Sequence, residues 1–323
     1  MQDGRTLCNP LNALVKDADI FVTSVQEDSK PRLGIDYETL RESNPKIIYV
    51  SFTGFGPKGP EKDSKGFDPM VQGYSGLGFV TGPDVPKVIQ IIFGDQMASI
   101  AVSHAMLAAL VARDRQGHGQ RIDVSLYGAL LWLNQANVLG TSVTGVNTNQ
   151  PWDRTINPPI RNTWKCKDGK WLIGTNHPDS VYWERLCKAM ELDHLLTDPR
   201  CATFEQREKN YREIVPIFDE KFLTKTRDEW MAIFRKYDMM FQIVQDLHQV
   251  INDPQALEND YLVEVDHPFV GKQRWPGYPY SFSENSTVQA VAPELGEHTV
   301  EVLTKLGYGP GDIAALRAKK VIN

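Results

Sequence analysis

The sequence predicts an α/β protein with a large domain built on a parallel sheet and a smaller α/β domain. Short β-branched runs alternate with helical segments in the first part of the chain, as in parallel sheets whose strands are joined by helices. The composition changes to Asn, Pro, Thr and Gly over residues 141–162, which is typical of a linker. Beyond it, an Asp-Gly pair separates two short strand patterns, which predicts a hairpin.

Two strands open the predicted large domain. Residues 19–23 (DIFVT) and 46–52 (KIIYVSF) are short apolar runs of the kind found in buried strands. Between them, a helix is expected to begin at Asp36, because an aspartate can accept hydrogen bonds from the first free N–H groups of a helix. Asn44-Pro45 ends this helix, since proline disfavours a helical residue before it.

A Gly- and Pro-rich stretch covers residues 54–94, and long segments with little periodicity are often functional. The Ala-, Met-, Leu- and Val-rich sequence that follows predicts a helix over residues 96–115, with Gly117 as its stop. Residues 121–126 (RIDVSL) predict a strand that leads into a further helix.

The expected domain boundaries follow from this order of segments. We place the large domain at residues 1–128 and 246–323, because the strand and helix patterns of the C-terminal part are expected to rejoin it. Residues 129–154 are the predicted linker, and residues 155–245 the small domain. Small-domain helices are predicted at residues 181–189, 207–223 and 227–237.

Composition and charge argue against several classes of protein. The chain has 323 residues, 41% of them apolar and 24% charged, and a net charge of −6, which is ordinary for a soluble globular protein. It has no long Lys/Arg block, so we expect no nucleic acid or anionic membrane as a partner. Four scattered cysteines fit neither a disulfide framework nor a metal site. We therefore expect a cytoplasmic protein without a metal.

The most suggestive residue for chemistry is Asp95, which lies between the strand-like run IIFG and the predicted helix. A carboxylate at a helix N-terminus meets free N–H groups that favour its ionised form. An ionised carboxylate can act as a nucleophile and form a covalent acyl intermediate. The alternative is that Asp95 only caps the helix, and from the residues alone this is the more frequent role.

A resemblance covers nearly the whole chain, from about Leu14 to the end. Each matching piece is weak alone, and their order and spacing carry the assignment. The chain resembles the family III (CaiB/BaiF-type) CoA-transferases. The matching pieces include ADIFV (18–22), RLGIDYE (32–38), NPKIIYVS (44–51), GFGPKGP (54–60), GFD (66–68), GHGQRIDVS (117–125), TRDEW (226–230), VEVDHP (263–268) and LGEHT (295–299).

The resemblance implies a fold, a reaction and its nucleophile. The implied fold has a Rossmann-like large domain and a smaller α/β domain, in an interlocked dimer. The family's nucleophilic aspartate, just before the long Ala-rich helix, falls on Asp95. CoA would pass from an acyl-CoA donor to a carboxylic acid acceptor through an aspartyl-CoA thioester. CoA is then a substrate, and no permanently bound cofactor is expected.

The resemblance also implies residues around CoA. Arg32 matches an arginine near the CoA phosphates, Lys65 a CoA contact, and Ser24 and Val25 the positions of an Asn and a Phe that contact CoA. Asp68 matches an acidic residue that lies near the nucleophile and is a possible assisting group. Without the resemblance, Arg32 and Lys65 would be read as solvated surface charges, and Asp68 as the cap of a turn or helix.

Two departures open alternatives. The chain lacks the N-terminal segment usual in the family, which predicts that a related companion subunit or a second copy covers the exposed core. The loop Thr23–Ser29 carries two acids where the family has an Asn-Phe-Arg-Pro-Gly pattern. A non-catalytic or partner-requiring subunit of a heteromeric transferase is therefore the main alternative. A third reading, an acyl-CoA racemase or epimerase, is disfavoured because Phe67 stands where those relatives use an acid/base histidine.

Overall fold

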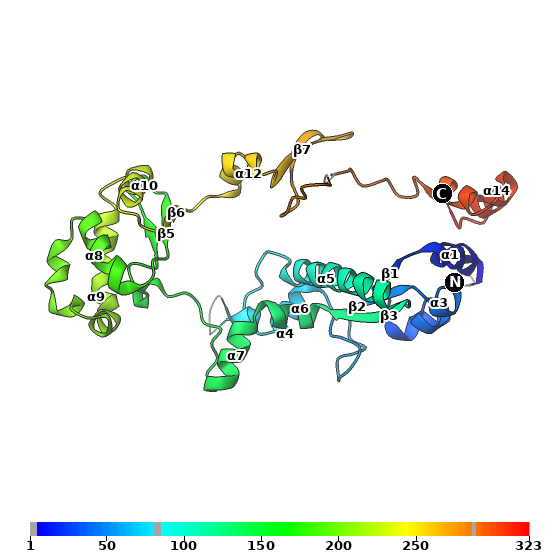
Figure 1. Cartoon of the computed structure of the whole chain (residues 1–323), viewed down its shortest axis with the longest axis horizontal. Coiled ribbons are helices and arrows are strands. Elements are labelled where there is room, and N and C mark those ends of the chain that lie inside the picture. The colour runs from blue at the N-terminus through cyan, green and yellow to red at the C-terminus, as the bar shows by residue number, and fades with distance from the viewer. Residues whose placement is uncertain (1–4, 81–84, 286–288, 323) are drawn as a thin grey trace. The chain divides into compact units, whose positions relative to one another are not determined.

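The computed structural model describes residues 5–80, 85–285 and 289–322 (Figure 1). The chain folds into two compact units, residues 1–152 with 293–323, and residues 153–292. The chain thus returns to the first unit at residue 293, whereas the sequence places this return at residue 246. The predicted membership of residues 246–292 in the large domain stays a prediction.

The first unit contains a three-stranded sheet and helices from both ends of the chain. Its helices are α1 (Arg5–Asp17), α2 (Lys30–Leu33), α3 (Tyr37–Ser43), α4 (Asp68–Tyr74), α5 (Phe93–Gln116), α6 (Leu126–Leu133), α7 (Gln135–Thr144), α13 (Thr299–Lys305) and α14 (Pro310–Ala318). Its strands are β1 (Ile20–Thr23), β2 (Ile48–Thr53) and β3 (Gln120–Ser125). The strands are parallel in the order β1-β2-β3, as the alternation of strand and helix predicts.

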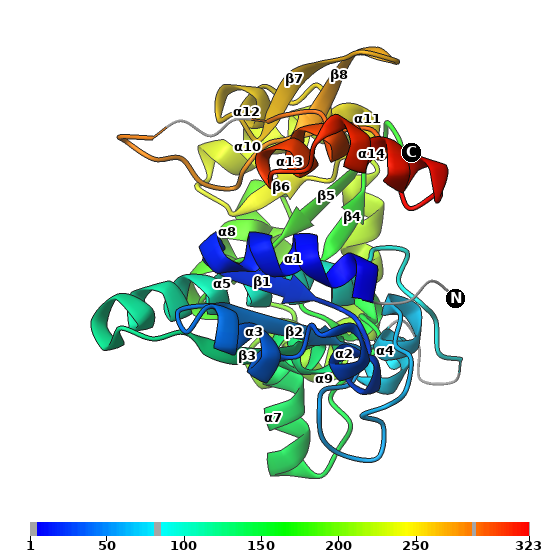
Figure 2. The same cartoon turned by 90° about the vertical axis from the view of Figure 1, so that its right-hand side faces the viewer.

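Alternate residues of β2 face two different helical layers. Ile48 and Val50 form one apolar cluster with Ala109 of α5, while Ile47 and Tyr49 form another with residues of α1 and α3. Figure 1 shows α5 running along the sheet, and Figure 2 turns the side that carries α1 and α3 toward the viewer. The sheet is therefore covered on both faces, as expected for parallel strands.

The helix α5 begins earlier than the sequence suggests. Its first residue is Phe93, three before the predicted start at residue 96, and Asp95 therefore lies inside the first turn. The helix ends at Gly117, whose φ of 82° is in the left-handed region, as the stop signal predicts. The predicted cap of α3 is also confirmed, because the Asp36 side chain accepts a hydrogen bond from the Thr39 N–H at 3.0 Å.

By length and composition alone, α5 could cross a membrane. It nevertheless packs on the sheet, with Val102, Met106 and Leu110 beside the cluster of Ala109, Ile48 and Val50. Its apolar residues thus pack one face of the sheet in the α/β unit, and we infer no membrane span from its composition.

The predicted linker is partly helical. The range 129–154 contains the end of α6 and all of α7, which continues to Thr144 before Gly145 ends it with a φ of 71°. Leu130 is fully buried against α4 and α5 residues, so apolar packing extends the first unit into this range.

The second unit has its own core. Its elements are β4 (Thr163–Lys165), β5 (Trp171–Gly174), α8 (Asp179–Ala189), α9 (Phe204–Phe222), α10 (Arg227–Lys236), β6 (Phe241–Ile243), α11 (Leu247–Val250), α12 (Pro254–Glu258), β7 (Leu262–His267) and β8 (Gly271–Pro276). The predicted hairpin is confirmed, since β4 and β5 pair antiparallel around the Asp-Gly turn. Trp164 is fully buried and stacks on Phe222 with ring centroids 4.8 Å apart.

Candidate active site

A cavity of about 520 Å³ lies in the first unit at the carboxyl ends of β1 and β2. Ligand sites of open parallel sheets usually form at this edge, because the loops that leave the strands converge there. Its walls come from the loop after β1, the end of β2, the loop before α4, the first turn of α5 and the start of α6. The lining residues are Ser24, Gln26, Glu27, Asp28, Phe52, Thr53, Gly54, Lys62, Asp63, Ser64, Lys65, Gly66, Phe67, Asp95 and Leu126.

Asp95 contributes to the cavity wall from the first turn of α5. It is exposed, and among the described residues no group donates a hydrogen bond to its carboxylate. A carboxylate that is accessible and has no hydrogen-bond partner is available to attack a carbonyl carbon.

Asp68 caps the helix that carries Asp95. Its Oδ2 atom accepts hydrogen bonds from the N–H groups of Gly94 at 2.6 Å and Asp95 at 3.3 Å. The residue is only 4% exposed. Gln72 donates to its other carboxylate oxygen and also bonds the backbone around Ile89 and Ile91. Asp68 thus fixes the backbone of the nucleophile candidate, and it satisfies two of the free N–H groups of α5.

The structure brings some of the predicted CoA residues to the cavity and leaves others outside its lining. Ser24 and Lys65 line the cavity together with Asp95. Arg32 and Val25 do not line it: Arg32 is exposed and its guanidinium donates to Ser29 Oγ at 3.3 Å, and the Val25 N–H donates to Thr23 Oγ1 at 3.2 Å. The CoA contacts predicted for these four residues stay predictions.

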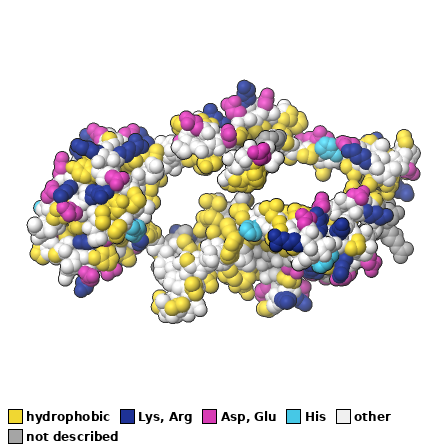
Figure 3. All heavy atoms as spheres, viewed as in Figure 1, with side chains coloured by type: hydrophobic (Ala, Val, Ile, Leu, Met, Phe, Trp, Pro, Cys, Tyr) yellow, Lys and Arg dark blue, Asp and Glu magenta, His cyan; other side chains and the backbone are white. Residues whose placement is uncertain are grey.

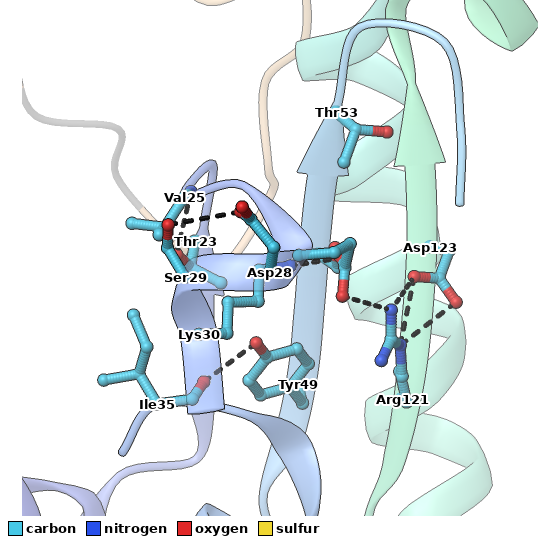
Figure 4. Close-up of polar contacts among 12 residues, drawn as sticks. Thr23, Val25, Asp28, Ser29, Lys30, Ile35, Tyr49, Thr53, Arg121 and Asp123 are labelled. Carbon is cyan, nitrogen blue, oxygen red and sulfur yellow. Dashed lines mark hydrogen bonds and ion pairs between the residues drawn. The ribbon is translucent and has the colours of Figure 1, made fainter. Parts of the chain in front are cut away.

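A polar network behind the cavity was not anticipated from the sequence. Lys30 is 1% exposed, and its Nζ atom donates to Glu27 Oε1 and, at 2.6 Å, to Ser51 Oγ. The Ser51 hydroxyl lies 2.6 Å from the same carboxylate oxygen. Arg121 lies 3.2 Å from Glu27 Oε2 and also donates to Asp123 from two nitrogens. Figure 4 shows Arg121 beside Asp123, and Tyr49 between Lys30 and Arg121.

The network keeps Glu27 ionised. Burial raises the pKa of Glu27, but hydrogen bonds from Lys30 and Ser51 and the charges of Lys30 and Arg121 lower it, and the net result is a pKa below the ordinary value of 4.5. Burial, with the Glu27 charge nearby, raises the pKa of Tyr49 to about 12. The phenol therefore stays neutral and donates to the Ile35 carbonyl at 2.9 Å. The signal in the sequence for the Glu27–Lys30 pair was the spacing of three residues between the acid and the base.

The loop that carries Lys62 and Lys65 is closed at its base by two glycines. An added Cβ on Gly54 would lie 2.6 Å from the Gly66 Cα, and one on Gly66 would lie 2.6 Å from the Gly54 Cα. No side chain fits where two backbone segments approach this closely. The crossing holds residues 54 and 66 together, so the loop between them projects as one unit at the edge of the cavity.

Comparison with known proteins decides the family. The sequence model described as CoA-transferase family III matches residues 6–299. The chain belongs to CoA-transferase family III.

Relatives in this family include characterised transferases. The chain is 31% identical to (R)-2-hydroxy-4-methylpentanoate CoA-transferase of Clostridioides difficile, a match that covers 97% of this chain and 79% of that protein. It is 32% identical to cinnamoyl-CoA:phenyllactate CoA-transferase of Clostridium sporogenes, over 97% of this chain and 77% of the relative. The family III assignment makes this chain a member of an enzyme family that moves CoA between acids.

Solved structures agree with the family III assignment. The crystal structure of a CaiB/BaiF family protein from Brucella suis matches with a TM-score of 0.81 and 26% identity, over 95% of this chain and 79% of that one. This match confirms the mixed α/β fold of the family.

Proposed function

We propose that this family III chain transfers CoA from an acyl-CoA donor to a carboxylic acid acceptor through an aspartyl-CoA thioester on Asp95. The observation that carries the proposal is the position of the Asp95 carboxylate. It lies in the wall of a 520 Å³ cavity, at the N-terminal turn of α5, with no hydrogen-bond partner among the described residues. A cavity of this volume is within the range of small-molecule sites.

The proposed first half-reaction loads CoA onto the protein. An Asp95 oxygen attacks the thioester carbonyl of the donor, the C–S bond breaks, and CoA leaves as the thiolate. The product on the protein is a mixed anhydride. The thiolate then attacks the aspartyl carbonyl of this anhydride, the donor acid leaves as its carboxylate, and an aspartyl-CoA thioester remains.

The second half-reaction reverses these steps with the acceptor. The acceptor carboxylate attacks the aspartyl thioester and expels the CoA thiolate. The thiolate attacks the acceptor acyl carbon of the new anhydride, which releases Asp95 as a free carboxylate and forms the new acyl-CoA. The bonds balance without an oxidant, a reductant or a bound cofactor.

The other predicted residues receive roles of different kinds. Lys65, with Lys62 beside it, offers positive charge to the phosphates of CoA, and Ser24 offers a hydroxyl. Val25 lies in the loop after β1, and Arg32 lies on α2. Both are proposed to contact CoA outside the described cavity. Asp68 is a positioning residue, because its Oδ2 atom accepts from the N–H groups at the start of α5 while Gln72 holds its Oδ1 atom.

The relatives suggest which acids to try first. Names in the family include (R)-2-hydroxy-4-methylpentanoate and phenyllactate as acids to which CoA is transferred. We propose monocarboxylic acids of this size, with and without the hydroxyl group, as the first acceptors. We further propose that the transfer between such acids takes place in the cytoplasm.

A partner-requiring subunit is the second candidate, favoured by one observation. The loop after β1 places Glu27 and Asp28 at the cavity wall. Lys30 and Arg121 compensate the charge of Glu27, but Asp28 has no cation as a partner among the described residues and opposes the binding of CoA phosphates nearby. A heteromer or homodimer in which another chain supplies CoA contacts would remove this difficulty. An epimerase remains the weaker reading, because Phe67 lines the cavity and its ring carries no exchangeable proton.

The proposal is tested by transfer assays with a panel of acyl-CoA donors and acceptor acids. The Asp95→Ala variant is expected to lose transfer by at least about 1,000-fold, as expected for a lost nucleophile. Asp63→Asn is the matched control, because Asp63 lines the same cavity and is expected to leave transfer within about threefold. Equal loss in both variants, or no loss in Asp95→Ala, would refute the role of Asp95.

A further inference from the structure

The Glu27 carboxylate is a fixed charge in the cavity wall. The side chain is 28% exposed, so it is held by the protein and yet reaches the cavity. Its Oε1 atom accepts from Lys30 Nζ and from Ser51 Oγ. Its Oε2 atom has Arg121 as its partner, with the guanidinium nitrogen at 3.2 Å. Three donors on three different elements therefore set the orientation of this carboxylate.

One acceptor position of Glu27 remains open. An ionised carboxylate offers about four lone-pair sites to donors. Among the described residues, Lys30 and Ser51 use two of them on Oε1, and Arg121 uses one on Oε2. The remaining site belongs to a residue that lines the same cavity as Ser24 and Asp95. A buried or half-buried acceptor without a donor loses free energy, so a ligand that supplies the donor is favoured.

The charge balance selects the kind of donor. Lys30 and Arg121 already compensate the charge of Glu27, so a further cation gains little at this position. A second ionised carboxylate placed against Glu27 only accepts hydrogen bonds, so it would leave the open acceptor site without a donor. A neutral hydroxyl or amide N–H satisfies the open site without either cost. Phe52 and Leu126 line the same cavity and make its wall partly apolar, which also disfavours an added charge.

We propose that Glu27 is a specificity-determining residue that accepts a hydrogen bond from a neutral donor of the substrate bound beside Asp95. This inference rests on the proposed CoA transfer and names a chemical requirement of that site. The donor comes from one of two sources: a hydroxyl on the acid, or a hydroxyl or amide N–H of the CoA arm. In both cases Glu27 discriminates against acids that place a second carboxylate at this position.

The test removes the acceptor without leaving a buried unpaired charge. In the double variant Glu27→Leu/Lys30→Met, apolar side chains replace both members of the pair, an exchange that is often neutral for stability. The matched control is Glu38→Leu/Arg41→Met, which makes the same kind of exchange in an exposed ion pair on α3, outside the cavity lining. Folding of each variant is checked by circular dichroism and thermal unfolding.

Two measurements distinguish the sources of the donor. The first is the ratio of kcat/KM for (R)-2-hydroxy-4-methylpentanoate over 4-methylpentanoate, with a common acyl-CoA donor. The second is the Kd of CoA by calorimetry, which needs no turnover. If the acid supplies the donor, the ratio falls about tenfold in the double variant; if CoA supplies it, the Kd of CoA rises about tenfold. The Glu38→Leu/Arg41→Met control leaves both values within about twofold.

The proposal would be overturned if the folded double variant kept both the ratio of kcat/KM values and the Kd of CoA unchanged. An equal change in the Glu38→Leu/Arg41→Met control would overturn it as well, since that variant retains the Glu27 acceptor. Hydroxylamine trapping on Asp95 in the wild-type protein separates this failure from failure of the transfer mechanism. Should no trapping occur, Asp95 chemistry is refuted, and calorimetry of CoA and of both acids still decides the role of Glu27.

Discussion

At the scale of single residues, Asp68 and Asp95 have different roles. Asp68 positions the backbone, and Asp95 is the candidate nucleophile. Asp68 is buried and has partners on both oxygens, while Asp95 is exposed and its carboxylate has none among the described residues. The first sets the position of the backbone from which the second projects. The resemblance implies that both acids lie near each other, but only the hydrogen bonds separate the positioning residue from the candidate nucleophile.

The positioning role of Asp68 predicts different effects for two substitutions. Asp68→Ala removes the acceptor for the Gly94 and Asp95 N–H groups and is expected to lower the free energy of unfolding by about 2 kcal/mol. Asp68→Asn keeps an oxygen for these groups and is expected to retain most of the stability and most of the transfer activity. Urea unfolding and transfer assays check both. Loss of activity in a stable Asp68→Asn variant would show that Asp68 is needed as an ionised group.

The Glu27–Lys30 pair predicts a pH dependence of stability. The pKa of Glu27 is lowered in the folded state, so its ionisation stabilises the fold above its unfolded pKa, near 4.5, and this contribution is lost as the pH falls through the lower folded pKa. Glu27→Gln leaves Lys30 buried without its charged partner and is expected to cost about 3 kcal/mol near pH 7. Urea unfolding should show this difference shrinking below pH 4.5. A difference that stays constant into the acid range would contradict the ion pair.

At the scale of elements, the loop between Gly54 and Gly66 connects β2 to α4 and carries two lysines of the cavity wall. Its base depends on backbone contact, whereas its outer residues Lys62, Asp63 and Ser64 are exposed. The loop therefore has a fixed attachment and a solvated rim. Such a segment can adjust to a ligand at its tip while its ends stay in place.

The crossing of the two glycines predicts the effect of one methyl group. Gly66→Ala places a Cβ against Gly54 and the Phe55 ring, and is expected to cost about 2 kcal/mol and to increase hydrogen exchange in residues 55–65. Gly73→Ala is the matched control, because an added Cβ in this helical position of α4 meets nothing within 4 Å. The control is expected to be neutral or slightly stabilising. Equal exchange in both variants would contradict the crossing.

Regular elements were predictable to the extent that local signals specify them. The strands at 19–23 and 46–52 and the hairpin at the Asp-Gly turn were predicted because β-branched runs and turn residues act locally. The helix α4 was missed, since Asp68-Pro69 follows a Gly-rich loop and the helix is only seven residues long. The start of α5 at Phe93 was also missed, because the capping carboxylate lies 26 residues away in the sequence.

The site was predictable in part for the same reason. The resemblance selected Asp95, Lys65 and Ser24, which line one cavity, because the order of segments preserves their place in the fold. Glu27 and its bond to Ser51 join residues 24 positions apart, and no local pattern specifies such a contact. Long-range polar networks therefore required the structure.

At the scale of the whole molecule, the outer side of α5 points to a second chain. Ile100, Leu107 and Val111 follow a helical spacing and are exposed by 53%, 65% and 53%. Figure 3 shows hydrophobic side chains gathered along this helix. A contiguous apolar strip of this kind is typical of a surface covered by another protein chain. We propose that it is covered in a homodimer or in a heteromer with a related subunit.

A charge on this strip is expected to disrupt the assembly. Leu107→Glu should shift the protein to a smaller mass in light scattering, because a buried unpaired carboxylate opposes association. Leu139→Glu is the matched control, since Leu139 on α7 is exposed to the same degree, 66%. A wild-type protein that is monomeric at all concentrations would contradict a homodimer. The heteromer then predicts association only when a related subunit is added.

The central claim is that Asp95 becomes covalently activated, and hydroxylamine trapping tests it most directly. Wild-type protein, incubated with each acyl-CoA donor, is quenched with hydroxylamine and digested, and the peptides are mapped by mass spectrometry beside Asp95→Ala and Asp63→Asn. We predict a hydroxamate on Asp95 in the wild type and in Asp63→Asn, and none in Asp95→Ala. Folded wild-type protein that gives no hydroxamate with any donor, alone or with an added related subunit, would contradict the aspartyl-CoA route.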